Sequence, residues 1–304
     1  MDSEFDRLGL LVKRGSFIDA TIVQAQRRPP SKEKTDKEKE EEASGMVYRE
    51  VITEKWEDYV GQITLNRPED LNTFNTQMAH ELDAALLEFD EDSNIRVIIV
   101  RGSGRVFCAG IDLKEFPGRS AADYQGWVEK MEKPFVTISK MKKPVIAQVH
   151  GVAAANGMGL VAAADLAIAS EDARMGLTAI NVGLNCIGPV IAVSRSVGRK
   201  KALEMLLYGK LIPAAEALSL GLVNRVVPPD TLEKEARIWA AELAQKSPLA
   251  IRMAKQAFYT SEDMDYEKQF AYTNEVFARL CTTEDAKEGI SAFFEKRNPT
   301  WRGK

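Results

Sequence analysis

The chain has 304 residues, 45% of them hydrophobic, so it can bury at least one large core. Its net charge of −4 argues against a general nucleic-acid surface, and three cysteines without close spacing argue against a disulfide scaffold or a zinc site. No apolar run is long enough to span a membrane, and acidic residues before the first apolar stretch argue against a signal peptide. We expect a cytoplasmic protein without a metal, nucleic-acid or membrane partner.

Residues 1–45 differ in composition from the rest of the chain. Short apolar pieces at 10–12 and 17–23 precede a run from Ser31 to Glu42 that is almost wholly polar or charged. Such a run cannot bury an apolar face, so we expect a disordered segment or a solvated helix. The stretch 12–25 resembles a fragment of a DDE-type transposase, with Asp19 as its first carboxylate. Because one carboxylate cannot perform metal-assisted strand transfer, a gene-fusion remnant is favoured over a native tail.

From Met46 the pattern alternates between strands and helices. Apolar, β-branched runs predict strands at 47–52, 60–65, 95–100, 145–149 and 166–169. Asn75 is a predicted cap for a helix that carries Met78, Leu82, Leu86 and Phe89 on one face. Further helices are predicted over 124–138, where Pro134 indicates a kink or restart, and over 160–164. This alternation indicates parallel strands joined by helical crossovers.

The strand signal fades after Pro213. Helical spacing then predicts four helices, at 232–245, 248–259, 266–280 and 283–296. The sequence therefore predicts an α/β core over residues 46–240, a helical region over 241–304, and a tail over 1–45.

Two turns rich in glycine and alanine follow strand-like runs. They are Val106–Leu113 and His150–Gly159. Turns of this kind present free backbone N–H groups to a ligand. Two of them side by side would supply two donors to a carbonyl oxygen that gains negative charge during a reaction.

Several motifs occur in the order typical of the crotonase superfamily, which includes the enoyl-CoA hydratases and isomerases. They are Thr64–Pro68 with Asn72, Phe107–Glu115, Lys143–Ala147 leading to Gly151, Asp165, Glu216–Ala217, Gly221–Val223, Glu284–Gly289 and Glu295–Arg297. The resemblance runs from about Val47 to Lys304. It implies a spiral of β-β-α units, a C-terminal helical region that packs in trimers or pairs of trimers, and an acyl-CoA thioester of fatty acid metabolism as ligand. Coenzyme A would be part of that substrate, with no separate cofactor.

The resemblance also implies which residues form the site. The backbone N–H groups of Ile111 and Asn156 would form an oxyanion hole. Other residues of the two turns would contact the substrate: Ala109, Gly110, Asp112 and Gly157. Basic residues in regions that family members use for the CoA phosphates are Arg67, Lys114, Lys296 and Arg297. Asp112 is more typical of a helix cap than of a catalytic group, and Glu115 and Asp165 are more typical of structural residues.

The chain departs from the family pattern at two positions. Typical hydratases have a glutamate at the position of Gly159 and another at that of Ala179, because water addition needs an acid and a base. Asn181–Leu184 with Cys186 is similar to the pattern of enoyl-CoA hydratase domain-containing proteins, which often lack this pair. Cys186 itself is more typical of a buried apolar residue than of a nucleophile. An external base such as bicarbonate, used by some family members, stays open.

These observations predict an acyl-CoA enzyme of the hydratase/isomerase type with an oxyanion hole and low or no classical hydratase activity. The alternative is a catalytically silent protein that binds acyl-CoA or a partner subunit. A DNA-binding transposase remnant is the third interpretation.

Overall fold

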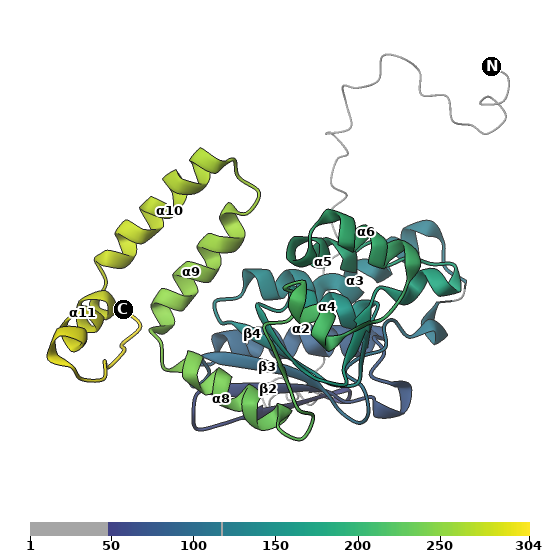
Figure 1. Ribbon diagram of the computed structural model, residues 1–304, viewed down its shortest axis with the longest axis horizontal. Coiled ribbons are helices and arrows are strands. Elements are labelled where there is room, and N and C mark those ends of the chain that lie inside the picture. Colours follow the sequence, from purple (N-terminus) through teal and green to yellow (C-terminus); the bar gives the residue numbers. More distant parts are fainter. Residues whose placement is uncertain (1–47, 117) are drawn as a thin grey trace, which may run out of the picture. The chain divides into compact units, whose positions relative to one another are not determined.

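A six-stranded sheet runs through this computed structural model, which describes residues 48–116 and 118–304 (Figure 1). The strand order is β1-β2-β3-β4-β6-β9; β1 pairs antiparallel with β2, and the other neighbours are parallel. The strands are β1 (Val51–Lys55), β2 (Val60–Leu65), β3 (Val97–Gly102), β4 (Val145–Val149), β6 (Leu166–Ser170) and β9 (Arg225–Val227). A second sheet contains β5 (Val152–Ala154), β7 (Arg174–Gly176) and β8 (Ile212–Pro213).

Helices cover both faces of the large sheet. Alternate residues of a strand point to opposite faces, so Val97 and Ile99 pack with α8 (Leu232–Ala244), whereas Ile98 and Val100 belong to the main core. That core includes α2 (Thr76–Glu91), α3 (Ala121–Lys140) and α4 (Asn156–Ala163). The remaining helices are α5 (Pro189–Val197), α6 (Arg199–Tyr208), α7 (Ala214–Ser219), α9 (Pro248–Ser261), α10 (Tyr266–Cys281) and α11 (Glu284–Glu295), with short 3-10 turns η2 (Pro68–Asp70), η3 (Leu113–Glu115) and η4 (Thr178–Val182).

The predicted α/β core and the helices at its C-terminal end are confirmed. The Asn75 side chain accepts the N–H of Met78 at 2.7 Å and so caps α2. α8, α9, α10 and α11 match their predicted ranges to within two residues at each end. The predicted division at residue 240 falls within α8 and remains a prediction, as does the tail over residues 1–45, which lies outside the described residues.

Several predicted boundaries were wrong. The first strand begins at Val51, because the N–H groups of Arg49 and Glu50 donate to the Glu81 carboxylate rather than to the sheet. α3 continues through Pro134 as one helix, so no restart occurs there. α4 begins at Asn156, four residues before the predicted start, and the short strand β9 lies in the region where the strand signal had faded.

Asp165 joins α9 to the core. Its carboxyl group accepts the N–H of Val145 at 2.7 Å, Lys255 Nζ at 2.6 Å and Tyr259 Oη at 3.0 Å. Lys255 Nζ also donates to the carbonyl of Lys143 at 2.8 Å. The structural role predicted for Asp165 is confirmed, but Asp165 works by linking β4 to α9 rather than by capping one helix.

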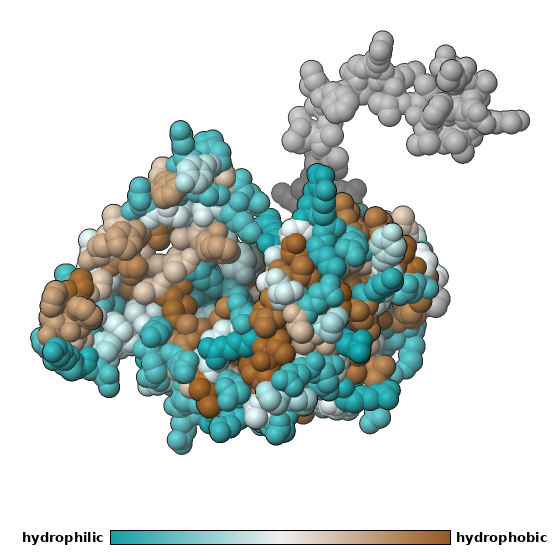
Figure 2. Space-filling model, viewed as in Figure 1, coloured by the Kyte–Doolittle hydropathy of each residue, from teal (hydrophilic) through white to brown (hydrophobic). Residues whose placement is uncertain are grey.

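Large apolar side chains remain exposed on the C-terminal helices. They include Phe258, Tyr266, Phe270, Phe277, Ile290, Phe293 and Phe294. Figure 2 shows apolar side chains over this region of the chain. Among the described residues, no helix is long and apolar enough to cross a membrane, and no group of three or more candidate ligands could hold a metal ion.

Candidate active site

The two turns predicted from the sequence lie side by side. Cys108 and Ala153 form a parallel bridge, in which the N–H of Cys108 donates to the carbonyl of Val152 at 3.1 Å and the N–H of Ala154 donates to that of Cys108 at 2.9 Å. A Cβ atom on Gly157 would collide with the carbonyl oxygen of Cys108. Backbone hydrogen bonds and a glycine therefore fix the separation of the two turns.

Each turn holds a backbone N–H group that has no acceptor among the described residues and belongs to a predicted oxyanion-hole residue. Within residues 48–116 and 118–304, the N–H groups of Ile111 and Asn156 donate no hydrogen bond, although their neighbours Asp112 and Ala155 donate to Phe74 and Gly176 at 2.7 and 2.9 Å. Asn156 is the first residue of α4, where the helix dipole favours negative charge. These two N–H groups are therefore available to a ligand oxygen.

Ala155 gives the second turn its direction. Its backbone has φ of 50° and ψ of −112°, a conformation that residues other than glycine rarely adopt. A Cβ atom on Gly110 would lie 3.0 Å from the Cβ atom of Ala155, so the two turns also approach each other here. The strained residue stands immediately before the free N–H of Asn156, as is common where a site requires a fixed geometry.

Ile111 and Asn156 line a cavity of about 800 Å³. Ala109 and Ala179 line it as well, together with Tyr124, Trp127 and Val128 of α3 and Gly188, Pro189 and Ile191 at the start of α5. A mostly apolar cavity with a few polar groups is typical of a small-molecule site. The geometry thus brings the two predicted donors and the Ala179 position into one cavity.

The Gly159 position has no room for an ordinary side chain. A Cβ atom on Gly159 would lie 2.9 Å from the Cβ atom of Pro189 and 3.1 Å from a ring carbon of Phe135.

Cys186 lines the cavity and is buried, which raises its thiol pKa. Glu115 accepts hydrogen bonds from Thr76 and Trp127, as expected for a structural residue.

Glu132 is a cavity residue that was not among the residues predicted from the sequence. It lies on α3, it is half-buried, and burial raises the pKa of its carboxyl group above the ordinary value of 4.5. The signal was its spacing: Tyr124, Val128 and Glu132 follow one another at intervals of four residues, so they share one helix face. A lone carboxylate in that apolar row marks the side of α3 that lines the cavity.

Comparison with known proteins decides the family. The family model for Enoyl-CoA hydratase/isomerase matches residues 55–304. A probable enoyl-CoA hydratase of Rhizobium meliloti is 38% identical over 258 residues, which cover 84% of this chain and 99% of that protein. The crystal structure of an enoyl-CoA hydratase from Mycobacterium smegmatis is similar with a TM-score of 0.81 and 39% identity, covering 83% of this chain and 99% of that chain.

This chain belongs to the enoyl-CoA hydratase/isomerase family. The crotonase fold implied by the sequence motifs is therefore confirmed. The human enoyl-CoA hydratase domain-containing protein 3, described as mitochondrial, is 36% identical over 245 residues, 80% of this chain and 81% of that protein. Because some relatives are named as mitochondrial, the cytoplasmic location remains a prediction.

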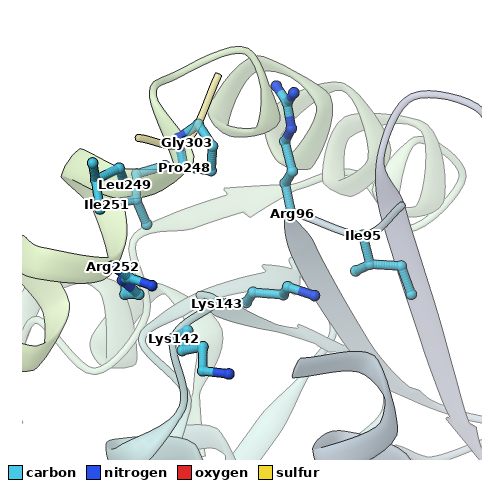
Figure 3. Close-up of a pocket in the computed structure, with 9 residues that line it drawn as sticks. All are labelled: Ile95, Arg96, Lys142, Lys143, Pro248, Leu249, Ile251, Arg252 and Gly303. Atoms are coloured by element: carbon cyan, nitrogen blue, oxygen red, sulfur yellow. The ribbon is translucent and has the colours of Figure 1, made fainter. Parts of the chain in front are cut away.

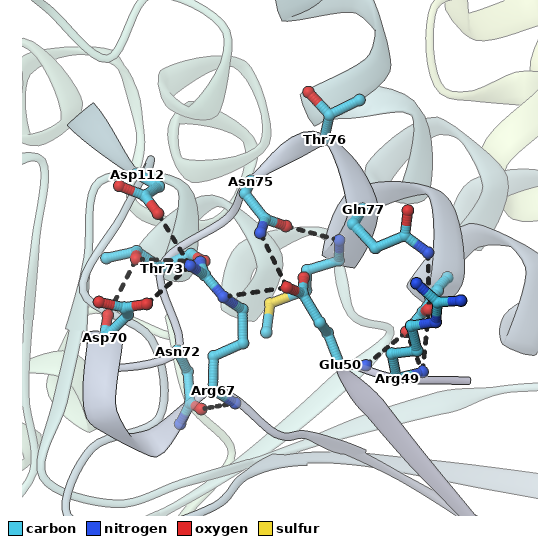
Figure 4. Close-up of polar contacts among 12 residues, drawn as sticks. Arg49, Glu50, Arg67, Asp70, Asn72, Thr73, Asn75, Thr76, Gln77 and Asp112 are labelled. Atoms are coloured by element: carbon cyan, nitrogen blue, oxygen red, sulfur yellow. Dashed lines mark hydrogen bonds and ion pairs between the residues drawn. The ribbon is translucent and has the colours of Figure 1, made fainter. Parts of the chain in front are cut away.

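Arg67, a predicted contact for CoA phosphates, is enclosed by acidic partners (Figure 4). Its side chain is only 12% exposed, and Nη2 lies 2.8 Å from Asp70 and 2.9 Å from Asp112. Nη1 donates to the carbonyl of Thr73 at 2.5 Å. Asp112 also caps η3 through the N–H of Lys114 at 3.0 Å, as predicted. This geometry favours a structural role for Arg67, and its phosphate contact stays a prediction.

The other three predicted cations do not line the cavity. Lys114 is 74% exposed and pairs with Asp70 at 2.5 Å. Lys296 ends α11, and Arg297 pairs with Glu288 and Glu295, each at 2.6 Å. Lys114 and Lys296 are both exposed, and among the described residues the Lys296 side chain makes no hydrogen bond or ion pair. The phosphate contacts of these three cations stay predictions.

A smaller hollow of about 160 Å³ is lined by cationic residues (Figure 3). Arg96 donates to the carbonyl of Ala244, Lys142 to the carboxylate of Glu91, and Lys143 to two carbonyls. The hollow shares no lining residue with the larger cavity. Three of its four cationic side chains thus contact neighbouring segments, and Arg252 is the fourth.

Proposed function

We propose that this protein binds an acyl-CoA thioester in the 800 Å³ cavity, with the thioester oxygen held by the N–H groups of Ile111 and Asn156. The observation that supports this is the pair of unpartnered donors on two turns locked together by backbone hydrogen bonds. A thioester oxygen gains negative charge when the α-carbon loses a proton or the β-carbon is attacked. Donors fixed in advance stabilise that charge by several kcal/mol.

The proposed activity lacks the two-glutamate hydration machinery. Gly159 and Ala179 supply neither an acid nor a base, so we expect little or no classical hydratase activity. The same absence favours a second candidate function, a silent protein that binds acyl-CoA or a partner subunit. A turnover screen with several acyl-CoA thioesters separates the two, since only the enzyme changes its ligand.

The exposed apolar side chains of α10 and α11 support the predicted assembly into trimers or pairs of trimers. Exposed apolar patches of this kind commonly mark contacts between proteins. Measuring the mass of the full chain in solution by light scattering tests this part of the proposal, and a monomer at micromolar concentration contradicts it.

A calorimetric titration of the full chain with crotonyl-CoA, compared with CoA alone, tests the thioester contact. Two hydrogen bonds of about 1 kcal/mol each correspond to a preference of about tenfold or more for the thioester. Asn156→Gly should keep this preference because it retains the N–H, whereas Asn156→Pro, which removes it, should lose it. Equal affinity for crotonyl-CoA and CoA would contradict the proposal.

A further inference from the structure

Glu132 reaches the cavity from a different helix than the family's usual acid. It projects from α3 and lines the cavity, and a Cβ atom on Gly188 would collide with its carboxyl group. Gly188 immediately precedes α5 and lines the same cavity. The carboxyl oxygens of Glu132 therefore lie against the backbone at the start of α5.

The residues next to this contact are those that fill the Gly159 position. Pro189, which follows Gly188, and Phe135, one helical turn after Glu132, would meet a Cβ atom on Gly159 at 2.9 and 3.1 Å. The wall beside Gly159 is thus formed by the residue after Gly188 and by a residue one helical turn from Glu132. The glutamate is missing from α4, and a carboxyl group stands beside the same wall from α3.

The Glu132 carboxyl group is free to react. Among the described residues it makes no ion pair or hydrogen bond, whereas Asp112 pairs with Arg67 and Glu115 accepts hydrogen bonds from Thr76 and Trp127. Burial raises the pKa of the Glu132 carboxyl group toward neutral pH. A higher pKa makes its carboxylate a stronger base. The other carboxylate that lines the cavity, Glu129, is exposed and accepts a hydrogen bond from Gln125.

We propose that Glu132 transfers protons to and from the α-carbon of the bound thioester. The inference rests on the proposed function, because it requires the thioester oxygen to lie at Ile111 and Asn156. The C–H bond at the α-carbon breaks and its proton moves to a carboxylate oxygen of Glu132. The bonding pair forms a carbon–carbon double bond, and the carbonyl π pair moves to the oxygen in the hole. Return of a proton to carbon reverses the step, so no co-reactant is needed.

Hydrogen–deuterium exchange at the α-carbon tests this assignment. The probe is 3-butenoyl-CoA, whose α-protons are acidified by the thioester and by the double bond, incubated with the full chain in D₂O and followed by NMR. Wild type should catalyse exchange, and its rate should rise with pH through an inflection above 4.5. A positioned base contributes about 10²–10⁴-fold, so Glu132→Gln should slow exchange at least 10²-fold and lose the inflection.

Two variants complete the experiment. Glu132→Asp keeps the carboxylate but shortens it, so it should exchange faster than Glu132→Gln and retain a pH inflection. Glu91→Gln makes the same change from carboxylate to amide outside the cavity, on the surface of α2, where Glu91 pairs with Lys142. This variant should exchange like wild type. If Glu132→Gln does not fold, the pH profiles of wild type and Glu132→Asp decide.

Binding measurements separate the two levels of the proposal. If wild type does not bind 3-butenoyl-CoA, the proposed function fails and the inference fails with it. If wild type binds but does not exchange, or if Glu132→Gln binds and exchanges at the wild-type rate, the role of Glu132 is contradicted and acyl-CoA binding stands.

Discussion

Asp165 and Glu132 carry two partly buried carboxyl groups with opposite surroundings. Burial raises the pKa of both. Asp165 accepts hydrogen bonds from Val145, Lys255 and Tyr259 at the junction between the core and α9. Glu132 lines a cavity without a partner among the described residues. A raised pKa alone therefore does not mark a reactive group; the presence or absence of partners separates a structural carboxylate from a chemical one.

The comparison assigns different roles to the two regions. At the α9 junction the charges are neutralised within the chain, so the contacts contribute to stability and to the position of the C-terminal helices. At the cavity, the unpaired N–H groups of Ile111 and Asn156 and the carboxyl group of Glu132 cost stability, because polar groups are withdrawn from water without protein partners. Sites that bind and react commonly carry such a cost.

The largest effect is expected from breaking the α9 junction. Asp165→Ala leaves Lys255 buried without its counter-ion, which should lower the free energy of unfolding by about 3–5 kcal/mol. Urea denaturation of the full chain measures this. Glu91→Ala, which removes an exposed ion pair with Lys142, is the matched control and should change little. A cost for Asp165→Ala no greater than that of the control would refute the structural role.

The next effect concerns the contact between the two turns. Gly157→Ala places a methyl group against the carbonyl oxygen of Cys108, which should lower the free energy of unfolding by about 1–3 kcal/mol and weaken crotonyl-CoA binding. Denaturation and calorimetric titration measure the two consequences. Unchanged stability and affinity would mean that the close approach of the turns does not shape the site.

Relief of the backbone strain at Ala155 should raise the free energy of unfolding rather than lower it. Ala155 pays about 1–3 kcal/mol for its backbone conformation, which glycine adopts without that strain. Because glycine loses about 0.5–1 kcal/mol more in backbone entropy on folding, Ala155→Gly should raise the Tm by a few degrees at most. Calorimetry checks this. A clear loss of stability would show that the alanine methyl group contributes packing that outweighs the strain.

Glu132 provides the smallest effect, and the size of that effect depends on pH. Its folded-state pKa is raised, so the folded chain binds the proton more tightly than the unfolded chain, and stability falls as pH rises from 4.5 through the folded-state value. Glu132→Gln has no carboxyl group to ionise at this position, so it does not lose stability in this way as pH rises. It should be slightly more stable than wild type near pH 7 and equal to it below about pH 4. Urea denaturation at both pH values checks this, and a destabilised variant near neutral pH would indicate a structural role.

Features encoded within a few residues were predictable from the sequence. The Asn75 cap, the Asp112 cap and the two turns each depend on a short segment, so their patterns could be interpreted without the fold. Asp112 shows the limit of this approach, because its ion pair with Arg67 joins residues 45 positions apart. Local chemistry could not reveal that the arginine is enclosed.

The surroundings of Gly159 were not predictable, since they depend on how helices pack. Pro189 from α5 and Phe135 from α3 occupy the space beside Gly159, and Glu132 reaches the same wall. The sequence shows only that glycine stands at position 159, where the family resemblance leads us to expect a glutamate. The four-residue spacing of Tyr124, Val128 and Glu132 could have pointed to Glu132, because it places them on one face of α3. The contact of Glu132 with Gly188 depends on the tertiary structure.

The rate of crotonyl-CoA hydration by the wild-type chain tests the central claim most directly. Gly159 and Ala179 supply no acid–base pair, so one carboxyl group on α3 would have to take a proton from the water and then return it to the α-carbon. We expect turnover well below the ordinary enzyme range of about 1–10³ per second, together with measurable binding of crotonyl-CoA. Hydration within that range would contradict the account, because a complete hydration machinery would then have to exist in the cavity.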